Sequence, residues 1–285
     1  MPSKKSPPAP APVPETLARL EHLYGDAGCS LDFGSPLQLL TATILSAQCT
    51  DARVNMVTPE VFKRFPDAAA LAAAPPGALE DVIRSTGFFN AKAKSLRGMA
   101  KALVEKHGGE VPRTMAELHA LPGVGRKTAN VVLGNVWNTP EGVVVDTHVG
   151  RLARRLGWTK NADPVRVEQD LNERIPQERW TWISHALILH GRRICASRRP
   201  KCDLCTLADI CPKVGVDEKK KKQETERKNK RKTKISLKVK RAGATGAAKR
   251  AAAAKAPHAP SKKILSFSSS PSSARPSAAR KGPRR

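Results

Sequence analysis

Short amphipathic patterns separated by glycine or proline run through the middle of the chain and predict an all-α fold. Residues 36–48 open with a proline in the first turn, and their apolar residues recur on one helical face: Leu37, Leu40, Ile44 and Ala47. Only residues 142–145 look extended, and four residues do not make a sheet. Further helices are predicted over 51–65 (capped by Asp51), 75–85, 91–106, 114–120, 126–136, 146–156, 164–174 and 179–194.

Both ends of the chain have a composition that does not support a packed core. We expect residues 1–14 and 214–285 to be disordered, because segments rich in Pro, Ala, Ser and Lys bury too little apolar surface to offset their ordering entropy. Residues 217–285 carry 23 Lys or Arg against 4 Asp or Glu, a net charge of +19 out of +26 for the whole chain. A basic tail on a mildly basic body indicates a polyanionic partner.

No stretch approaches the roughly 20 apolar residues that span a bilayer, and prolines occupy the place of a signal-peptide core. We therefore expect an intracellular protein without a membrane partner, in the cytoplasm or nucleoid of a bacterium or the nucleus of a eukaryote. Thiols stay reduced in such compartments, so the six cysteines do not indicate three disulfides.

A glycine-rich turn, Leu121-Pro-Gly-Val-Gly125, lies between two predicted helices. Glycines permit positive φ and a close approach of the backbone, and the next helix presents free N–H groups in its first turn. Such a turn can bind a DNA phosphate. The candidate contacts are Leu121, Gly123, Val124, Gly125 and Arg126. An ordinary helix–helix turn has the same pattern.

Lys127 stands in the first turn of the helix after this hairpin. Most of the 51 basic residues are expected to be solvated surface groups. At this position the positive helix terminus and the neighbouring Arg126 both disfavour the ammonium form. A neutral lysine amine is a nucleophile that can form a Schiff base with a sugar carbon.

Asp146 follows the extended residues and is predicted to be the N-cap of the next helix, which alone would explain it. It can also share a cleft with Lys127. The helix 126–137 carries the chain roughly 16 Å away at about 1.5 Å per residue, and residues 138–145 can span roughly 26 Å on the return. An ionised carboxylate there can stabilise a cationic transition state or take up protons.

Four of the six cysteines fall within 17 residues, spaced Cys195-x6-Cys202-x2-Cys205-x5-Cys211. In an intracellular chain this concentration indicates a metal site, and four thiolates suit either zinc or an iron–sulfur cluster. The isolated Cys29 and Cys49 are predicted to be small core residues.

Taken together, these elements resemble the endonuclease III family of helix-hairpin-helix base-excision glycosylases. The resemblance covers roughly residues 15–212 and keeps the family's order of elements. It rests on Leu121-Pro-Gly-Val-Gly-Arg-Lys-Thr-Ala-Asn130, Val145-Asp-Thr-His148, Leu187-Ile-Leu-His-Gly-Arg192, the cysteine spacing, and Ser46-Ala-Gln48 with Thr50-Asp51.

The resemblance implies a two-lobed, all-α helix-hairpin-helix glycosylase fold. Residues 36–137 would form a six-helix barrel lobe, and residues 15–35 would join 138–213 in an iron–sulfur lobe. Its [4Fe–4S] cluster would be held by Cys195, Cys202, Cys205 and Cys211, with a structural and DNA-organising role.

The resemblance also implies a monomeric DNA glycosylase and abasic-site lyase that acts on double-stranded DNA with oxidised pyrimidines or abasic sites. Lys127 would attack the deoxyribose C1′ while Asp146 balances the developing charge, and the strand would break by β-elimination. Gln48 would fill the gap left by the flipped base, and Phe88 would be an intercalating wedge where the family often has Leu.

Two alternatives remain at this stage. An adenine-mismatch glycosylase shares the hairpin, the aspartate and the four cysteines, but it lacks a lysine matching Lys127 and usually has a folded C-terminal domain. A non-catalytic DNA-binding module would need only the hairpin and the basic tail.

Overall fold

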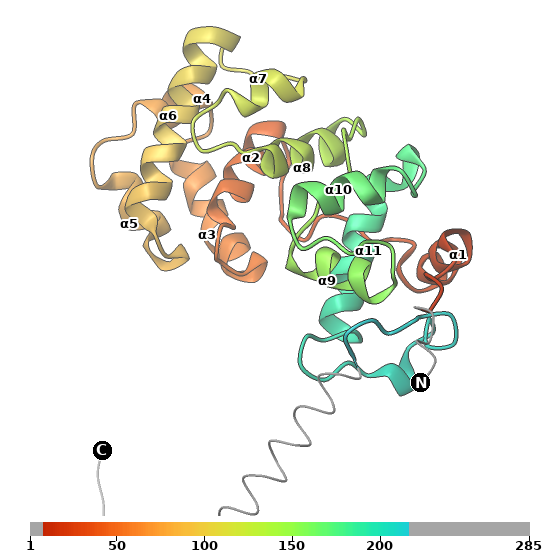
Figure 1. Ribbon diagram of the computed structural model, residues 1–285. Helices are drawn as coiled ribbons and strands as arrows, with labels where there is room; N and C mark the ends of the chain where they lie inside the picture. Colours follow the sequence, from red (N-terminus) through yellow and green to blue (C-terminus); the bar gives the residue numbers. More distant parts are fainter. Residues whose placement is uncertain (1–7, 217–285) are drawn as a thin grey trace, which may run out of the picture. The chain divides into compact units, whose positions relative to one another are not determined.

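The computed structural model describes residues 8–216, and all regular secondary structure in this range is helical (Figure 1). Eleven α-helices and three short 3-10 helices follow one another, with no strand among the described residues. The all-α prediction is thus confirmed, and residues 142–145 form an extended segment without a β partner. The disorder expected for residues 1–7 and 217–285 lies outside the described residues.

The helices connect through short turns. They are α1 (Val13–Tyr24), α2 (Pro36–Leu45), α3 (Asp51–Arg64), α4 (Ala68–Ala72), α5 (Ala78–Ile83), η1 (Arg84–Thr86), α6 (Phe89–His107), α7 (Met115–His119), α8 (Arg126–Val136), α9 (Thr147–Arg155), α10 (Pro164–Asn172), η2 (Gln177–Arg179), α11 (Trp180–Arg193) and η3 (Cys202–Leu204).

Two separate clusters of buried apolar side chains stabilise this arrangement. The first core cluster is built from α2 to α8 and the turns between them, with Leu39, Leu96 and Leu133 at its centre. The second core cluster combines α1 with α9, α10 and α11, and it buries Leu20, Trp158 and Leu187. Helix α1 therefore packs against elements more than a hundred residues further along the chain (Figure 1).

Polar side chains define where most of these helices begin. Ser35, Thr50, Asp67, Thr114, Asp146 and Asp163 each accept a hydrogen bond from a backbone N–H of the first turn, which satisfies a donor that has no partner within the helix. The sequence-based choice of Asp51 as the cap of α3 is wrong, because the Thr50 hydroxyl takes that role and Asp51 is the first helical residue.

Two further elements differ from the sequence-based expectations. Helix α4 was not predicted, because its Ala-rich five residues contain too few large apolar side chains to show a period. Residues 8–14 and 214–216 were expected to belong to disordered tails, yet Ala11 and Val216 are buried and α1 begins at Val13. The Ala11 N–H donates to the Leu156 carbonyl, and the Ala11 carbonyl accepts from the Trp158 indole. These tertiary bonds order a segment whose local sequence favours no structure.

None of the helices described combines the length and the hydropathy that crossing a bilayer requires.

Candidate active site

One cavity of about 330 Å³ is lined by elements of both core clusters. Its walls come from the segment 28–31, the end of α2, helices α8 and α11, and the segment that leads into α9. Lys127, Asp146 and Gln48 all line it, although they are far apart in sequence. Phe88 and residues 121–126 are not among its lining residues.

The hairpin before α8 is anchored by two buried side chains, Leu121 and Val124. Gly123 has φ of 78°, and a Cβ at this position would stand 2.6 Å from the Ser95 Cβ, so both the conformation and the packing require glycine. Gly125 differs, because its φ is −87° and nothing lies near the place of a Cβ. Because Gly125 has no side chain, it cannot cap α8, and the N–H groups of the first turn stay open to an external acceptor.

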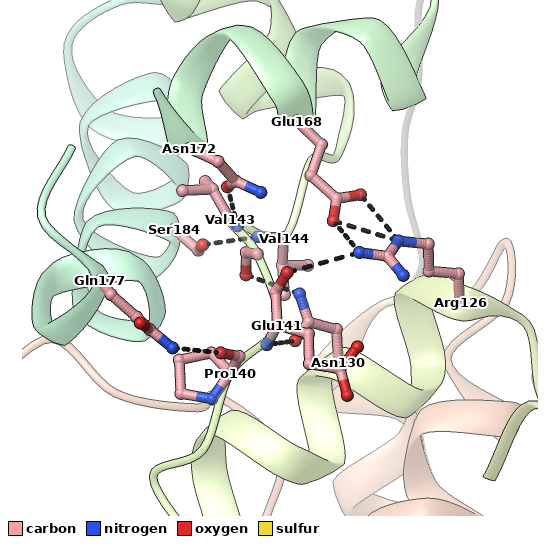
Figure 2. Close-up of polar contacts among 11 residues, drawn as sticks. Arg126, Asn130, Pro140, Glu141, Val143, Val144, Glu168, Asn172, Gln177 and Ser184 are labelled. Atoms are coloured by element: carbon pink, nitrogen blue, oxygen red, sulfur yellow. Dashed lines mark hydrogen bonds and ion pairs between the residues drawn. The ribbon is translucent and has the colours of Figure 1, made fainter. Parts of the chain in front are cut away.

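Lys127 is the second residue of α8, and its side chain is exposed at the cavity. Its neighbour Arg126 forms an ion pair with Glu168 of α10, with Nη2 2.8 Å from Oε1 (Figure 2). This hydrogen bond to Glu168 raises the pKa of the Arg126 guanidinium. Glu168 also neutralises much of the charge that Arg126 presents to Lys127.

Asp146 is the N-cap of α9, as its position in the sequence predicts. Its Oδ1 accepts hydrogen bonds from the N–H groups of His148 and Val149, at 2.7 and 2.8 Å. Its Oδ2 takes part in no hydrogen bond with the described residues. One carboxylate oxygen is thus fixed by the helix, and the other remains available at the cavity that Asp146 lines.

Side chains from three helices fix the extended segment that leads to Asp146 (Figure 2). Asn130 of α8 accepts from the Glu141 N–H at 2.9 Å and donates to the Gly142 carbonyl at 2.5 Å. Asn172 of α10 accepts from the Val143 N–H, and Ser184 of α11 accepts from the Val144 N–H. Because this segment has no β partner, these bonds determine its course.

Asn130 stands three residues after Lys127 on the same helix, so it ties the lysine's helix to the aspartate's segment. Sequence reasoning noted Asn130 only as part of a motif and assigned it no role. The sequence did contain a signal for this role. Asn130 is a polar amide at a helix position where an apolar residue is expected, and it precedes a segment that lacks backbone hydrogen-bond partners.

A second link between the core clusters lies at another wall of the cavity. Arg192 of α11 forms an ion pair with Asp51 of α3, Nη2 to Oδ2 at 2.9 Å. Nearby, His185 Nε2 lies 2.9 Å from Asn135 Oδ1, and burial lowers the pKa of this histidine. All four residues line the cavity, so its walls include an ion pair and an imidazole.

The two residues expected to enter the DNA stack share an unusual backbone conformation. Gln48 has φ of 53° and Phe88 has φ of 48°, both in the left-handed region that disfavours residues other than glycine. Both are exposed, and the Phe88 side chain is 68% accessible, high for a large apolar residue. Each therefore presents its side chain at a sharp turn.

The four grouped cysteines follow α11 and lie near one another as free thiols. Burial raises the pKa of the Cys205 and Cys211 thiols, and the neighbouring cysteines of the group raise it further. The buried Arg155 donates from Nη1 to the Cys195 sulfur at 3.0 Å and bonds to three carbonyls of residues 195–197. Among residues 8–216, no three Cys, His, Asp or Glu side chains already form a metal-ligand arrangement.

The chain is similar in sequence to proteins of DNA repair. A family model described as HhH-GPD superfamily base excision DNA repair protein matches residues 41–177. Endonuclease III of Synechocystis sp. is 55% identical over 198 residues, which cover 70% of this chain and 90% of that protein. Endonuclease III of Escherichia coli K12 is 39% identical over 197 residues, which cover 69% of this chain and 93% of that protein.

Solved structures give the same result. A trapped endonuclease III–DNA covalent intermediate matches with a TM-score of 0.68 at 39% identity, over 74% of this chain and 97% of that one. A thermostable thymine-DNA glycosylase has a TM-score of 0.63 at 20% identity, over 72% of this chain and 96% of that one, which is a likeness of fold alone.

The role of Asn130 in holding the segment before Asp146 can be tested by Asn130→Leu. The substitution leaves the Glu141 N–H and the Gly142 carbonyl without their partner, and each unsatisfied buried group costs about 1–3 kcal/mol. Urea unfolding should show this loss, and amide hydrogen exchange at residues 141–146 should become faster.

Asn55→Leu is the matched control, because Asn55 makes the same kind of bond pair with the Asp32 N–H and the Ser30 carbonyl at an exposed position. It should cost less and leave exchange at residues 141–146 unchanged. Equal exchange in the two variants at residues 141–146 would contradict the assigned role of Asn130.

Proposed function

Because the chain belongs to the endonuclease III family of base excision DNA repair proteins, we propose that it excises oxidised pyrimidines from duplex DNA and cleaves the strand 3′ to the abasic site by β-elimination. The single observation that carries this proposal is that Lys127 and Asp146 line one cavity. An amine and a carboxylate are the two groups that such a glycosylase and lyase requires.

The cavity suits a nucleotide taken out of the stack. Its volume of about 330 Å³ lies within the range of small-molecule sites, about 300–1,000 Å³. A base inside a duplex cannot reach Lys127, so the damaged nucleotide must be flipped outward first. A pyrimidine saturated at C5–C6, such as thymine glycol, has lost the flat ring that stacks well, which lowers the cost of flipping it.

The chemistry then runs through Lys127. Its Nζ forms a bond to the deoxyribose C1′, the bond from C1′ to the base breaks, and the electron pair leaves with the base. Nζ then loses one proton, the C1′–O4′ bond breaks as O4′ takes up a proton, and a protonated Schiff base forms between Nζ and C1′. This cation acidifies the C2′ proton, and removal of that proton expels the 3′ phosphate oxygen. A covalent enzyme–DNA bond is also what the similar trapped endonuclease III complex contains.

Asp146 contributes a fixed negative charge to these steps. Its Oδ1 is held by two backbone N–H groups, so the carboxylate needs no reorganisation when positive charge develops on the sugar. The unbonded Oδ2 is the oxygen assigned to charge balance and proton transfer.

DNA binding is assigned to the hairpin and the start of α8. The free N–H groups in the first turn of α8 would donate to a phosphate. Arg126 would release Glu168 and bind the same phosphate. Gln48 and Phe88 would enter the stack from the other side of the flipped nucleotide. The enzyme would act as a monomer where genomic DNA lies.

The four grouped cysteines are assigned to a [4Fe–4S] cluster with a structural role. The residues present fit such a group. Burial and the neighbouring cysteines raise the pKa of the Cys205 and Cys211 thiols, an effect that a cationic centre would reverse, and the Arg155 N–H already donates to the Cys195 sulfur. The cluster would hold the loop after α11, whose Arg198, Arg199 and Lys201 can then meet phosphates.

The nucleophile can be identified by trapping. With duplex DNA containing one thymine glycol, borohydride should reduce the Schiff base and link protein to DNA covalently. Lys127→Ala should abolish this adduct while DNA binding persists, and the exposed Lys160→Ala should leave it intact. An undiminished adduct in Lys127→Ala would exclude Lys127 as the nucleophile.

The charge of Asp146 can be separated from its role as a cap. Asp146→Asn keeps a good N-cap but removes the negative charge, so base release in single-turnover kinetics should slow about 100-fold or more. Asp163→Asn makes the same change at the N-cap of α10 and should have no such effect. Normal base release by folded Asp146→Asn would reduce Asp146 to a cap.

The metal assignment predicts a brown protein with iron and acid-labile sulfide in about equal amounts. Cys202→Ser should lose iron and become less stable, whereas Cys29→Ser, a cysteine outside the group, should retain the iron. Colourless protein with stoichiometric zinc, produced with ample iron, would overturn the cluster in favour of a zinc site.

A further inference from the structure

Lys92, in the first turns of α6, is a buried lysine for which the proposed mechanism has no role. Its side chain is only 5% exposed, and burial lowers the pKa of its ammonium group. Its Nζ donates two hydrogen bonds, to the Leu45 carbonyl at 2.8 Å and to the Thr86 carbonyl at 2.9 Å. Burying a cation is costly, so the two carbonyl bonds must compensate for lost water.

Both carbonyls belong to the last residue of a helix. Leu45 ends α2 and Thr86 ends η1, and carbonyls at helix ends lack partners within the helix. A cation at a helix C-terminus also meets the negative end of the helix dipole. One ammonium group therefore joins the ends of two helices that are separated by about forty residues of chain.

The chain reaches the two DNA-stack candidates directly beyond these carbonyls. Gln48 follows Leu45 by three residues, and Phe88 follows Thr86 by two. Both have positive φ, a conformation that persists only where the surroundings hold it. Both side chains are exposed, so the rest of the fold does little to hold them. The bonds from Lys92 act on the backbone at the base of each turn.

We propose that Lys92 is a positioning residue that fixes the Gln48 turn and the Phe88 turn relative to each other, so that both side chains enter the duplex together when a nucleotide is flipped. The proposal rests on the function proposed above. Lys92 touches neither the sugar nor the base, and it contributes to the flipping step alone. It should therefore matter for duplex DNA and not for DNA whose target is already unpaired.

The test compares two substrates for each protein, namely an abasic site in a duplex and the same abasic site in a single strand. Lys92→Met keeps the length and apolar stem of the side chain but removes the donors. The ratio of single-turnover nicking rates, duplex over single strand, should fall about 10-fold, as expected when a transition-state interaction is lost. Lys101→Met, on the exposed face of the same helix, should leave the ratio unchanged.

The outcomes separate the two proposals. No nicking of either substrate by the unaltered protein would refute the proposed function. Given nicking, an unchanged ratio in Lys92→Met, or equal loss on both substrates, would overturn the positioning role. If Lys92→Met does not fold, Lys92→Gln is judged by the same ratio. Failure of both to fold while Lys101→Met folds would also overturn the positioning role, since it would make Lys92 a residue of general stability.

A double-mutant cycle distinguishes the positioning role of Lys92 from a general effect on protein stability. If Lys92 acts through the two turns, Lys92→Met should slow duplex nicking no further in a protein that already carries Gln48→Ala and Phe88→Ala. A full additional loss in that background would show that Lys92 acts elsewhere.

Discussion

Backbone hydrogen bonding of the segment between α8 and α9 is the constraint on which the active-site geometry depends. Residues 140–145 lie between helices of the two core clusters without helical or β partners, so their N–H and C=O groups must bond to side chains or water. Asn130, Asn172 and Ser184 supply those bonds, one from each of three helices. The segment then places Asp146 at the start of α9, where it lines the cavity.

The same principle explains two cations of this basic protein that are buried rather than exposed at the surface. Arg155 donates to the carbonyls of residues 195–197 and organises the approach to the grouped cysteines. Lys92 joins the ends of α2 and η1. In each case a buried cation lies against partial negative charges of the backbone, and loss of the side chain would leave those carbonyls unsatisfied. These two residues fix the conformation of the backbone, whereas exposed lysines contribute mainly to the electrostatic potential of the surface.

Fixed geometry matters here because the proposed chemistry needs little beyond an amine, a carboxylate and a displaced nucleotide. When the reacting groups are held in place, much of the entropic part of the barrier is removed before the substrate binds. Lys127 is held by the helix that Asn130 ties to the next segment, and Asp146 by the N–H groups that it caps. The ion pair between Arg192 and Asp51 joins the core clusters at another wall of the same cavity.

The sequence by itself determined the helical fold, the cap at Asp146, the hairpin before Lys127 and the grouping of four cysteines. Each of these depends on residues close together in the chain, where periodicity, capping and spacing act directly. Tertiary structure alone decided the pairing of Arg126 with Glu168, the ordering of Ala11 by Trp158 and the burial of Lys92. In the sequence Lys92 looks like any other of the 51 basic residues. Its partners are carbonyls, which every residue has, so only the meeting of two distant helix ends distinguishes it.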